Sequence, residues 1–179
     1  MDQLLAAEAA GERMKYVPFW GHTPPPDGSI GAHVLSQWFL HPFEHEGVRY
    51  RTAEHFMMAA KARLFGDHEM LASILDAGTP AEAKMFGREV RGFSSEIWDV
   101  ECVAIVREGS IAKFESSPAL RAYLVGTGDR VLVEASPRDR IWGIGMGRNN
   151  PSVERPSEWR GRNLLGFALM QARAVLAQA

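Results

Sequence analysis

Residues 50–65 read Tyr-Arg-Thr-Ala-Glu-His-Phe-Met-Met-Ala-Ala-Lys-Ala-Arg-Leu-Phe, and the remaining chain can be understood by working outward from them. Thr52 is suited to cap a helix, because its hydroxyl accepts a hydrogen bond from an early backbone amide, and the Ala, Met, Leu and Lys that follow are good helix formers. At about 100° per residue, the small and apolar side chains fall on one face. This face consists of Ala53, Phe56, Met57, Ala60 and Leu64. The stretch therefore predicts an amphipathic helix that packs against the core.

A second, narrower arc of the same helix carries Glu54, Met58, Lys61 and Phe65. An acid, a base and two large apolar side chains on one arc are typical of a pocket wall. Glu54 lies in the first turn, where the helix dipole favours its ionised form, and Lys61 follows about 10 Å along the helix axis. The two side chains could therefore serve one substrate. The alternative is that Glu54 only caps the helix and Lys61 is a solvated charge.

Length and composition indicate one soluble globular domain. The 179 residues are 46% hydrophobic and 23% charged, and the net charge of −2 gives no general attraction to nucleic acid or to an anionic membrane. Cys102 is the single cysteine, which excludes an internal disulfide and any multi-cysteine zinc site. The six histidines form no close pair of ligands on a helix, and we expect neither a metal nor a cofactor.

Residues 1–15 form an Ala-rich N-terminal extension, and we assign residues 16–179 to the folded domain. The extension lacks the basic segment and uninterrupted apolar core of a signal peptide. No run of residues approaches the roughly 20 apolar positions that a membrane helix needs. We therefore expect a cytoplasmic protein with no membrane partner.

The other elements follow from turn and capping signals. We expect strands at 16–20 and 130–136, a hairpin turn at Glu46-Gly47, a capping box at Thr79 and Glu82, and a long loop at 22–33. The predicted helices span residues 68–77, 80–90, 96–114, 118–126 and a C-terminal segment after Gly161. Because several helices separate the first strands from the last, the fold class is α+β: a mostly helical single domain with a small β-sheet.

A second unusual stretch, residues 137–148, follows the late strand. Gly143, Gly145 and Gly147 alternate in it, but Arg148 stands where a dinucleotide-binding fingerprint requires glycine. An alternating glycine loop still allows close approach of the backbone to a ligand and offers amides that suit phosphate. Asp139 at the start of the loop adds a carboxylate to this candidate site.

The order of several short motifs resembles the NADAR (YbiA-like) family over about residues 16–175. The motifs are Thr52-Ala53-Glu54-His55-Phe56 with Lys61; Ala83-Lys84 with Gly87-Arg88; Trp98; Ala112-Lys113-Phe114; Leu132-Val133-Glu134-Ala135-Ser136-Pro137 with Asp139; Ile141-Trp142-Gly143-Ile144-Gly145; and Trp159-Arg160-Gly161-Arg162-Asn163-Leu164-Leu165-Gly166. Two positions depart from the family pattern: Gln37 stands where Asn is usual, and Met58 stands where Gln is common.

The resemblance implies an α+β N-glycosidase that acts on phosphorylated or ADP-ribosylated N-glycosides. Members are associated with the removal of ADP-ribose from guanine in nucleic acid, and with the hydrolysis of early riboflavin-pathway intermediates. Carried over by position, the site would be lined by Glu54, Lys61, Asp139 and the Trp142-Gly143 loop. We favour guanine-linked ADP-ribose, in nucleic acid or nucleotides. An ADP-ribosyltransferase would then be the functional counterpart. A non-catalytic reader of ADP-ribose or NAD is the alternative from another class.

The chemistry of the residues agrees with this implication. Cleavage of an N-glycosidic bond builds positive charge at the ribose C1 atom, which a carboxylate such as Glu54 or Asp139 would stabilise. Lys61 could protonate the departing nitrogen or attack C1 as a nucleophile, and the sequence does not separate these roles.

Further residues are candidates for binding the substrate. Tryptophans could stack on a base and basic side chains could meet phosphates, although each of them could equally be structural. The candidate set is Phe19, Trp20, Arg88, Trp98, Lys113, Glu134, Trp142, Gly143, Gly145, Arg162 and Asn163.

Overall fold

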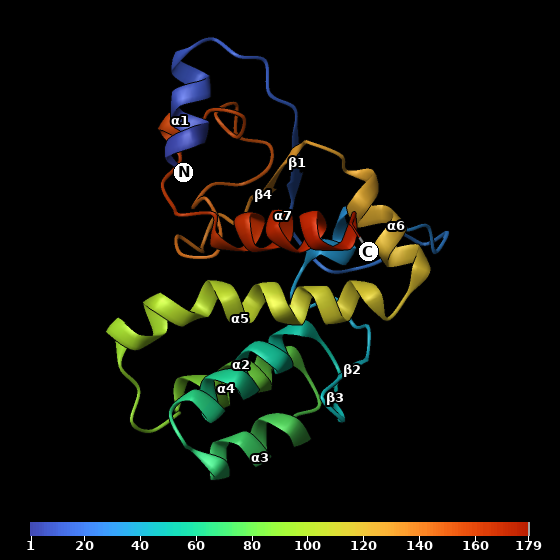
Figure 1. Ribbon diagram of the computed structural model, residues 1–179, viewed down its shortest axis with the longest axis vertical. Coiled ribbons are helices and arrows are strands. Elements are labelled where there is room, and N and C mark those ends of the chain that lie inside the picture. The colour runs from blue at the N-terminus through green and yellow to red at the C-terminus, as the bar shows by residue number, and fades with distance from the viewer. Residues whose placement is uncertain (179) are drawn as a thin grey trace.

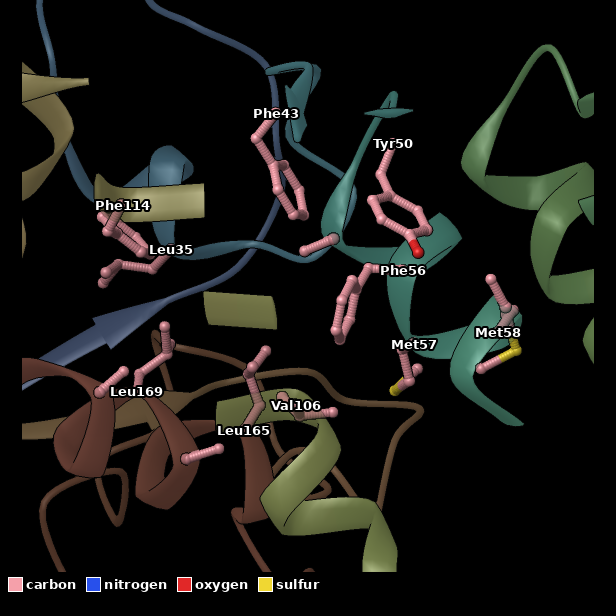
Figure 2. Close-up of a cluster of buried hydrophobic side chains, with 14 of the residues drawn as sticks. Leu35, Phe43, Tyr50, Phe56, Met57, Met58, Val106, Phe114, Leu165 and Leu169 are labelled. Atoms are coloured by element: carbon pink, nitrogen blue, oxygen red, sulfur yellow. The ribbon is translucent and has the colours of Figure 1, made fainter. Parts of the chain in front are cut away.

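In the computed structural model, which describes residues 1–178, the central stretch forms helix α2 (Ala53–Leu64). Thr52 caps it as predicted, with its hydroxyl oxygen accepting the His55 N–H at 3.4 Å. Phe56 packs edge-on against Tyr50 at a ring-centroid distance of 5.0 Å and lies 6.2 Å from Phe43. Figure 2 shows these three rings turned toward one another at the start of α2. Ala53, Phe56 and Met57 of the predicted apolar face are thus buried in the core and Ala60 is half-buried, whereas Leu64 at the end of the helix is 38% exposed.

Helix α5 (Ser95–Glu115) runs through the centre of the molecule and separates two groups of helices (Figure 1). On one side it packs against α7 (Leu164–Leu176), and on the other against α2. The remaining helices of the body are α3 (His68–Asp76), α4 (Pro80–Arg88) and α6 (Pro118–Gly126). The predicted capping box of Thr79 and Glu82 is present at the start of α4. The predicted helix boundaries agree with these to within two residues.

The β-structure consists of two separate two-stranded sheets, whereas the sequence predicted one small sheet. Strand β1 (Tyr16–Phe19) pairs in parallel with β4 (Val131–Glu134), so that Phe19 lies opposite Glu134. Strands β2 (Phe43–His45) and β3 (Val48–Tyr50) form a separate antiparallel hairpin. Its turn is the predicted Glu46-Gly47, where both residues have positive φ angles of 50° and 74°. Together the elements establish an α+β fold.

The N-terminal extension contains a helix that the sequence analysis did not predict, α1 (Asp2–Ala9). It packs against a short 3₁₀ helix, η2 (Pro156–Glu158). The Glu8 carboxylate accepts hydrogen bonds from the Ser157 backbone N–H and hydroxyl, both at 2.9 Å. Within residues 1–178, no helix combines the length and the apolar character required to span a bilayer.

The start of α7 is locked onto the backbone of β4. Asn163, fully buried with a positive φ of 54°, accepts the Glu134 N–H at 3.0 Å and donates to the Leu132 carbonyl at 3.0 Å. A Cβ atom built on Gly166 would lie only 2.1 Å from the Leu132 oxygen. Glycine at this position is what lets the helix approach the strand.

Gly166→Ala should therefore destabilise the fold by about 1–3 kcal/mol, the usual effect of forcing an extra carbon into a packed core. Urea unfolding measures the loss. Gly126→Ala, at the end of α6, is the matched control, because beyond its neighbours in the chain no described residue comes within 4 Å of its added carbon. Equal stability of the two variants would contradict the close approach of α7 to β4.

Candidate functional site

A cavity of about 400 Å³ opens beside the end of the β1–β4 pair and the start of α2. Its walls come from the residues after β1, the segment before β2, the first turns of α2, helix α4 and the loop after β4. The lining residues are Trp20, Gly21, His22, Ser36, Gln37, Trp38, Glu54, Met57, Lys84, Glu134, Ser136, Arg138, Asp139, Trp142 and Leu165.

Glu54 reaches this cavity from the first turn of α2. Its backbone N–H donates to the Gln37 carbonyl at 3.0 Å, and its side chain is almost completely buried. The Oε1 atom has no hydrogen-bond partner within residues 1–178. Burial raises the pKa of Glu54 to about 7, against a smaller lowering by the positive charge of Lys84. Burial thus outweighs the helix dipole, which by itself was expected to keep this carboxylate ionised.

Two more carboxyl groups line the same cavity. Glu134 ends β4, and burial together with the negative charge of Asp139 raises its pKa to about 8. Asp139 organises the loop, since its Oδ1 atom accepts the N–H groups of Ile141 at 2.9 Å and Trp142 at 2.8 Å. Three acids from a helix, a strand and a loop therefore share one cavity.

The raised pKa values predict how stability depends on pH. For Glu54 the pKa rises from an ordinary 4.5 to about 7 on folding, so its contribution to stability is greatest below pH 4.5 and is lost as the pH rises through 7. Glu54→Gln removes this loss. Compared with the native protein, the variant should gain free energy of unfolding between pH 5 and pH 8, measured by urea titration at each pH. A difference that does not change with pH would contradict the burial of this carboxyl group.

The amine in the cavity is Lys84, which extends from α4 and lies 5.9 Å from the Trp38 ring centroid. Ala83-Lys84 belongs to the motifs shared with the family, but the sequence predicted no role for Lys84. Its position in the cavity depends on how α4 packs against α2, which no local signal shows.

Lys61, expected to converge with Glu54, does not line the cavity. Its ammonium donates to the Gly87 carbonyl at 2.7 Å and lies 4.1 Å from the Phe93 ring centroid. The arc that carries Met58 and Lys61 is directed at α4 instead. A Cβ atom on Gly87 would lie only 2.0 Å from the Met58 sulfur, so the two helices touch there without room for a ligand.

Of the three candidate tryptophans, the structure brings Trp20 and Trp142 to the cavity and leaves Trp98 outside it. Trp98 packs against the core, 5.8 Å from the Lys61 nitrogen. Trp38, which the sequence analysis did not single out, lines the cavity in its place. Three indole rings thus line the same cavity as the acids.

The basic residues that were expected to meet phosphates lie outside the lining of the cavity. Lys113 is fully buried and hydrogen-bonded to backbone carbonyls, Arg162 lies 3.6 Å from Asp99, and Arg88 is exposed outside the cavity. The arginine that lines the cavity is Arg138, at the start of the loop after β4.

The other candidates shape the site without lining it. Phe19 is buried in the core opposite Glu134, and Asn163 holds the backbone of β4. A Cβ atom on Gly143 would lie 2.8 Å from the Glu134 carbonyl oxygen, and Gly145 has a φ angle of 68°. These residues fold the loop tightly against the strand that carries Glu134.

Among the described residues, no three His, Cys, Asp or Glu side chains are grouped in a way that could hold a metal ion. The side chains that line the cavity offer carboxyl, ammonium, guanidinium, imidazole, hydroxyl and amide groups together with flat indole surfaces.

Comparisons with known proteins extend over most of the chain. The model of the NADAR domain family matches residues 18–177. N-glycosidase R617 of Acanthamoeba polyphaga mimivirus is 40% identical over 167 residues, which cover 90% of this chain and 96% of that protein. N-glycosidase YbiA of Escherichia coli is 30% identical over 143 residues, covering 80% of this chain and 81% of YbiA. The NMR structure of E. coli YbiA aligns with a TM-score of 0.72 and 27% identity, over 92% of this chain and 86% of that one. The chain belongs to the NADAR domain family.

Proposed function

We propose that this protein is an N-glycosidase that hydrolyses the bond between a nucleobase nitrogen and the C1 atom of ribose. The relatives in mimivirus and E. coli carry the name N-glycosidase. The observation that carries the proposal is the buried Glu54 carboxyl group, whose Oε1 atom finds no partner among residues 1–178 in a cavity shared with Glu134 and Asp139. A buried polar atom without a partner is costly, and a bound substrate would offset that cost.

The three acids suit the two charges that such a reaction develops. As the C1–N bond breaks, its electron pair moves to the base nitrogen and positive charge grows at C1. The Asp139 carboxylate, fixed by two backbone N–H groups, supplies negative charge to this centre. Glu54 and Glu134, with pKa values of about 7 and 8, hold protons near neutral pH and can donate one to the leaving nitrogen.

Water completes the reaction. Its oxygen bonds to C1, and the carboxylate that gave up its proton takes one back from the water, so the enzyme returns to its starting state. Lys84 offers a second route, because its side chain could protonate the base or attack C1 directly. These are the two alternatives that the sequence left open for Lys61.

For the substrate we propose guanine-linked ADP-ribose, which an ADP-ribosyltransferase would supply. Trp20, Trp38 and Trp142 offer flat surfaces for a planar base, and Arg138 offers a guanidinium for phosphate. A volume of about 400 Å³ lies in the range of small-molecule sites.

The test incubates the protein with ADP-ribosylated guanosine and, in parallel, with a phosphoribosylated pyrimidine intermediate of riboflavin synthesis. Mass spectrometry measures the free base released, and we expect release from the guanosine substrate. Release from the pyrimidine alone would replace the substrate assignment. Tight binding of ADP-ribose without release of a base from either compound would make the protein a reader and overturn the glycosidase proposal.

A further inference from the structure

Lys113 is a buried lysine for which the proposed reaction has no use. It lies near the end of α5 and is 1% exposed. Its Nζ atom donates to the carbonyl of Val34 at 2.6 Å and to that of Ser36 at 2.8 Å. Burying an amine is costly unless it is hydrogen-bonded, so these two bonds are what allow Lys113 to lie in the core.

The two carbonyls belong to the end of a short 3₁₀ helix, η1 (Ala32–Leu35), and to the residue that follows it. From there the chain continues through Ser36, Gln37 and Trp38, and these three consecutive residues all line the cavity. The segment 36–38 lies in neither a helix nor a strand, so it has no regular hydrogen-bond ladder to hold it.

The segment 36–38 is fixed from both sides instead. The Lys113 amine binds the carbonyl of Ser36, and the Gln37 carbonyl accepts the backbone N–H of Glu54 at 3.0 Å. The backbone N–H of Trp38 donates to the Ser36 hydroxyl oxygen at 3.2 Å. A continuous path of hydrogen bonds and backbone therefore leads from Lys113 to the acid in the cavity.

The Lys113 amine can hold both carbonyls in either protonation state. Burial lowers the pKa of Lys113 to about 7, and a neutral amine still has two N–H groups, one for each carbonyl. The charged form retains the same two bonds and has the rings of Phe39 and Phe114 at 5.6 and 5.2 Å. The groups packed around it thus satisfy the side chain without any acidic partner among the described residues.

We infer that Lys113 is a positioning residue, which fixes the segment 36–38 and through it the placement of Glu54 in the cavity. The effect on catalysis rests on the proposed function, whereas the effect on the backbone does not. Misplacement of a reacting group by about 1 Å can cost about 100-fold in rate. Loss of the bonds that fix the segment 36–38 should therefore lower the turnover rate.

The experiment compares Lys113→Met with the control Lys61→Met in the full chain. Lys61 is also partly buried and donates to one backbone carbonyl, that of Gly87, away from the segment 36–38. Hydrogen exchange followed by mass spectrometry reports on the amides of residues 34–38 and of Glu54. Steady-state kinetics with ADP-ribosylated guanosine separates kcat from KM.

In Lys113→Met we expect exchange at these amides to be at least tenfold faster while α7 stays protected, and kcat to fall at least tenfold. Lys61→Met should change neither. Native exchange at residues 34–38, an equal loss of kcat in the control, or a loss confined to KM would each overturn the inference. If Lys113→Met does not fold, Lys113→Gln must show the same pattern, because its side chain is one bond shorter and its N–H groups no longer reach both carbonyls. A native protein that releases no base from either ADP-ribosylated guanosine or the pyrimidine intermediate would refute the proposed function and leave the exchange result to decide the role of Lys113.

Discussion

Glu54→Gln is expected to lower the turnover of guanine-linked ADP-ribose by at least about 100-fold, the lower end of the range for losing a general acid. Glutamine matches the size of glutamate but can neither hand a proton to the leaving nitrogen nor carry the negative charge that follows. The fold should survive, because the native carboxyl group is already disfavoured as an ion by its burial. Mass spectrometry of released guanine gives the rate, and circular dichroism with thermal unfolding checks the fold.

Glu108→Gln is the matched control for this substitution. Glu108 lies on α5 outside the cavity and contacts His45 at 2.8 Å, so it shares the chemistry of the change without access to the substrate. Its turnover should stay within about twofold of the native rate. Near-native turnover in Glu54→Gln would remove Glu54 from the mechanism.

Lys84→Met should also lower turnover by at least about 100-fold, within the range found when a proton donor or nucleophile is lost. Within residues 1–178, Lys84 is the lysine that lines the cavity. Its positive charge lowers the pKa values of Glu54 and Glu134, against the increase that burial causes. Lys61→Met serves as the control because its ammonium is engaged by the Gly87 carbonyl outside the cavity. The reverse ranking, with Lys61→Met inactive and Lys84→Met active, would contradict the site described above.

Borohydride separates the two roles of the amine. If Lys84 attacks C1 and the sugar ring opens, reduction during turnover should leave a stable sugar adduct on Lys84, located by peptide mass spectrometry. Absence of an adduct under turnover, together with the loss of activity in Lys84→Met, would assign the amine to proton donation.

Elements marked by local signals could be predicted from the sequence. Thr52 before the apolar stripe fixed the start of α2, Thr79 and Glu82 fixed that of α4, and Glu46-Gly47 fixed the hairpin turn. Each depends on hydrogen bonds or backbone angles within a few residues. Helix α1 lacks a side-chain cap and buries none of its residues, so local signals for it were weak.

The composition of the site was harder to predict, because helical spacing shows which side chains share a face but not what that face meets. Glu54 and Lys61 do share an arc, yet it is the start of α2 that reaches the cavity. Farther along the same arc, Met58 packs against α4 at Gly87. Lys84 and Trp38 enter the site through tertiary packing. Lys113 looked like a phosphate ligand, although it binds the backbone of Val34 and Ser36.

The parallel pairing of β1 with β4 determines when the site can exist during synthesis. Tyr16 pairs with Val131 and Phe19 with Glu134, so the strand that presents one of the acids aligns with a segment that is synthesised much earlier. Such distant contacts form slowly, because a long loop must close before they are gained. A nascent chain on the ribosome therefore cannot form this part of the cavity until β4 has emerged, and a product terminated before β4 would lack both Glu134 and Asp139.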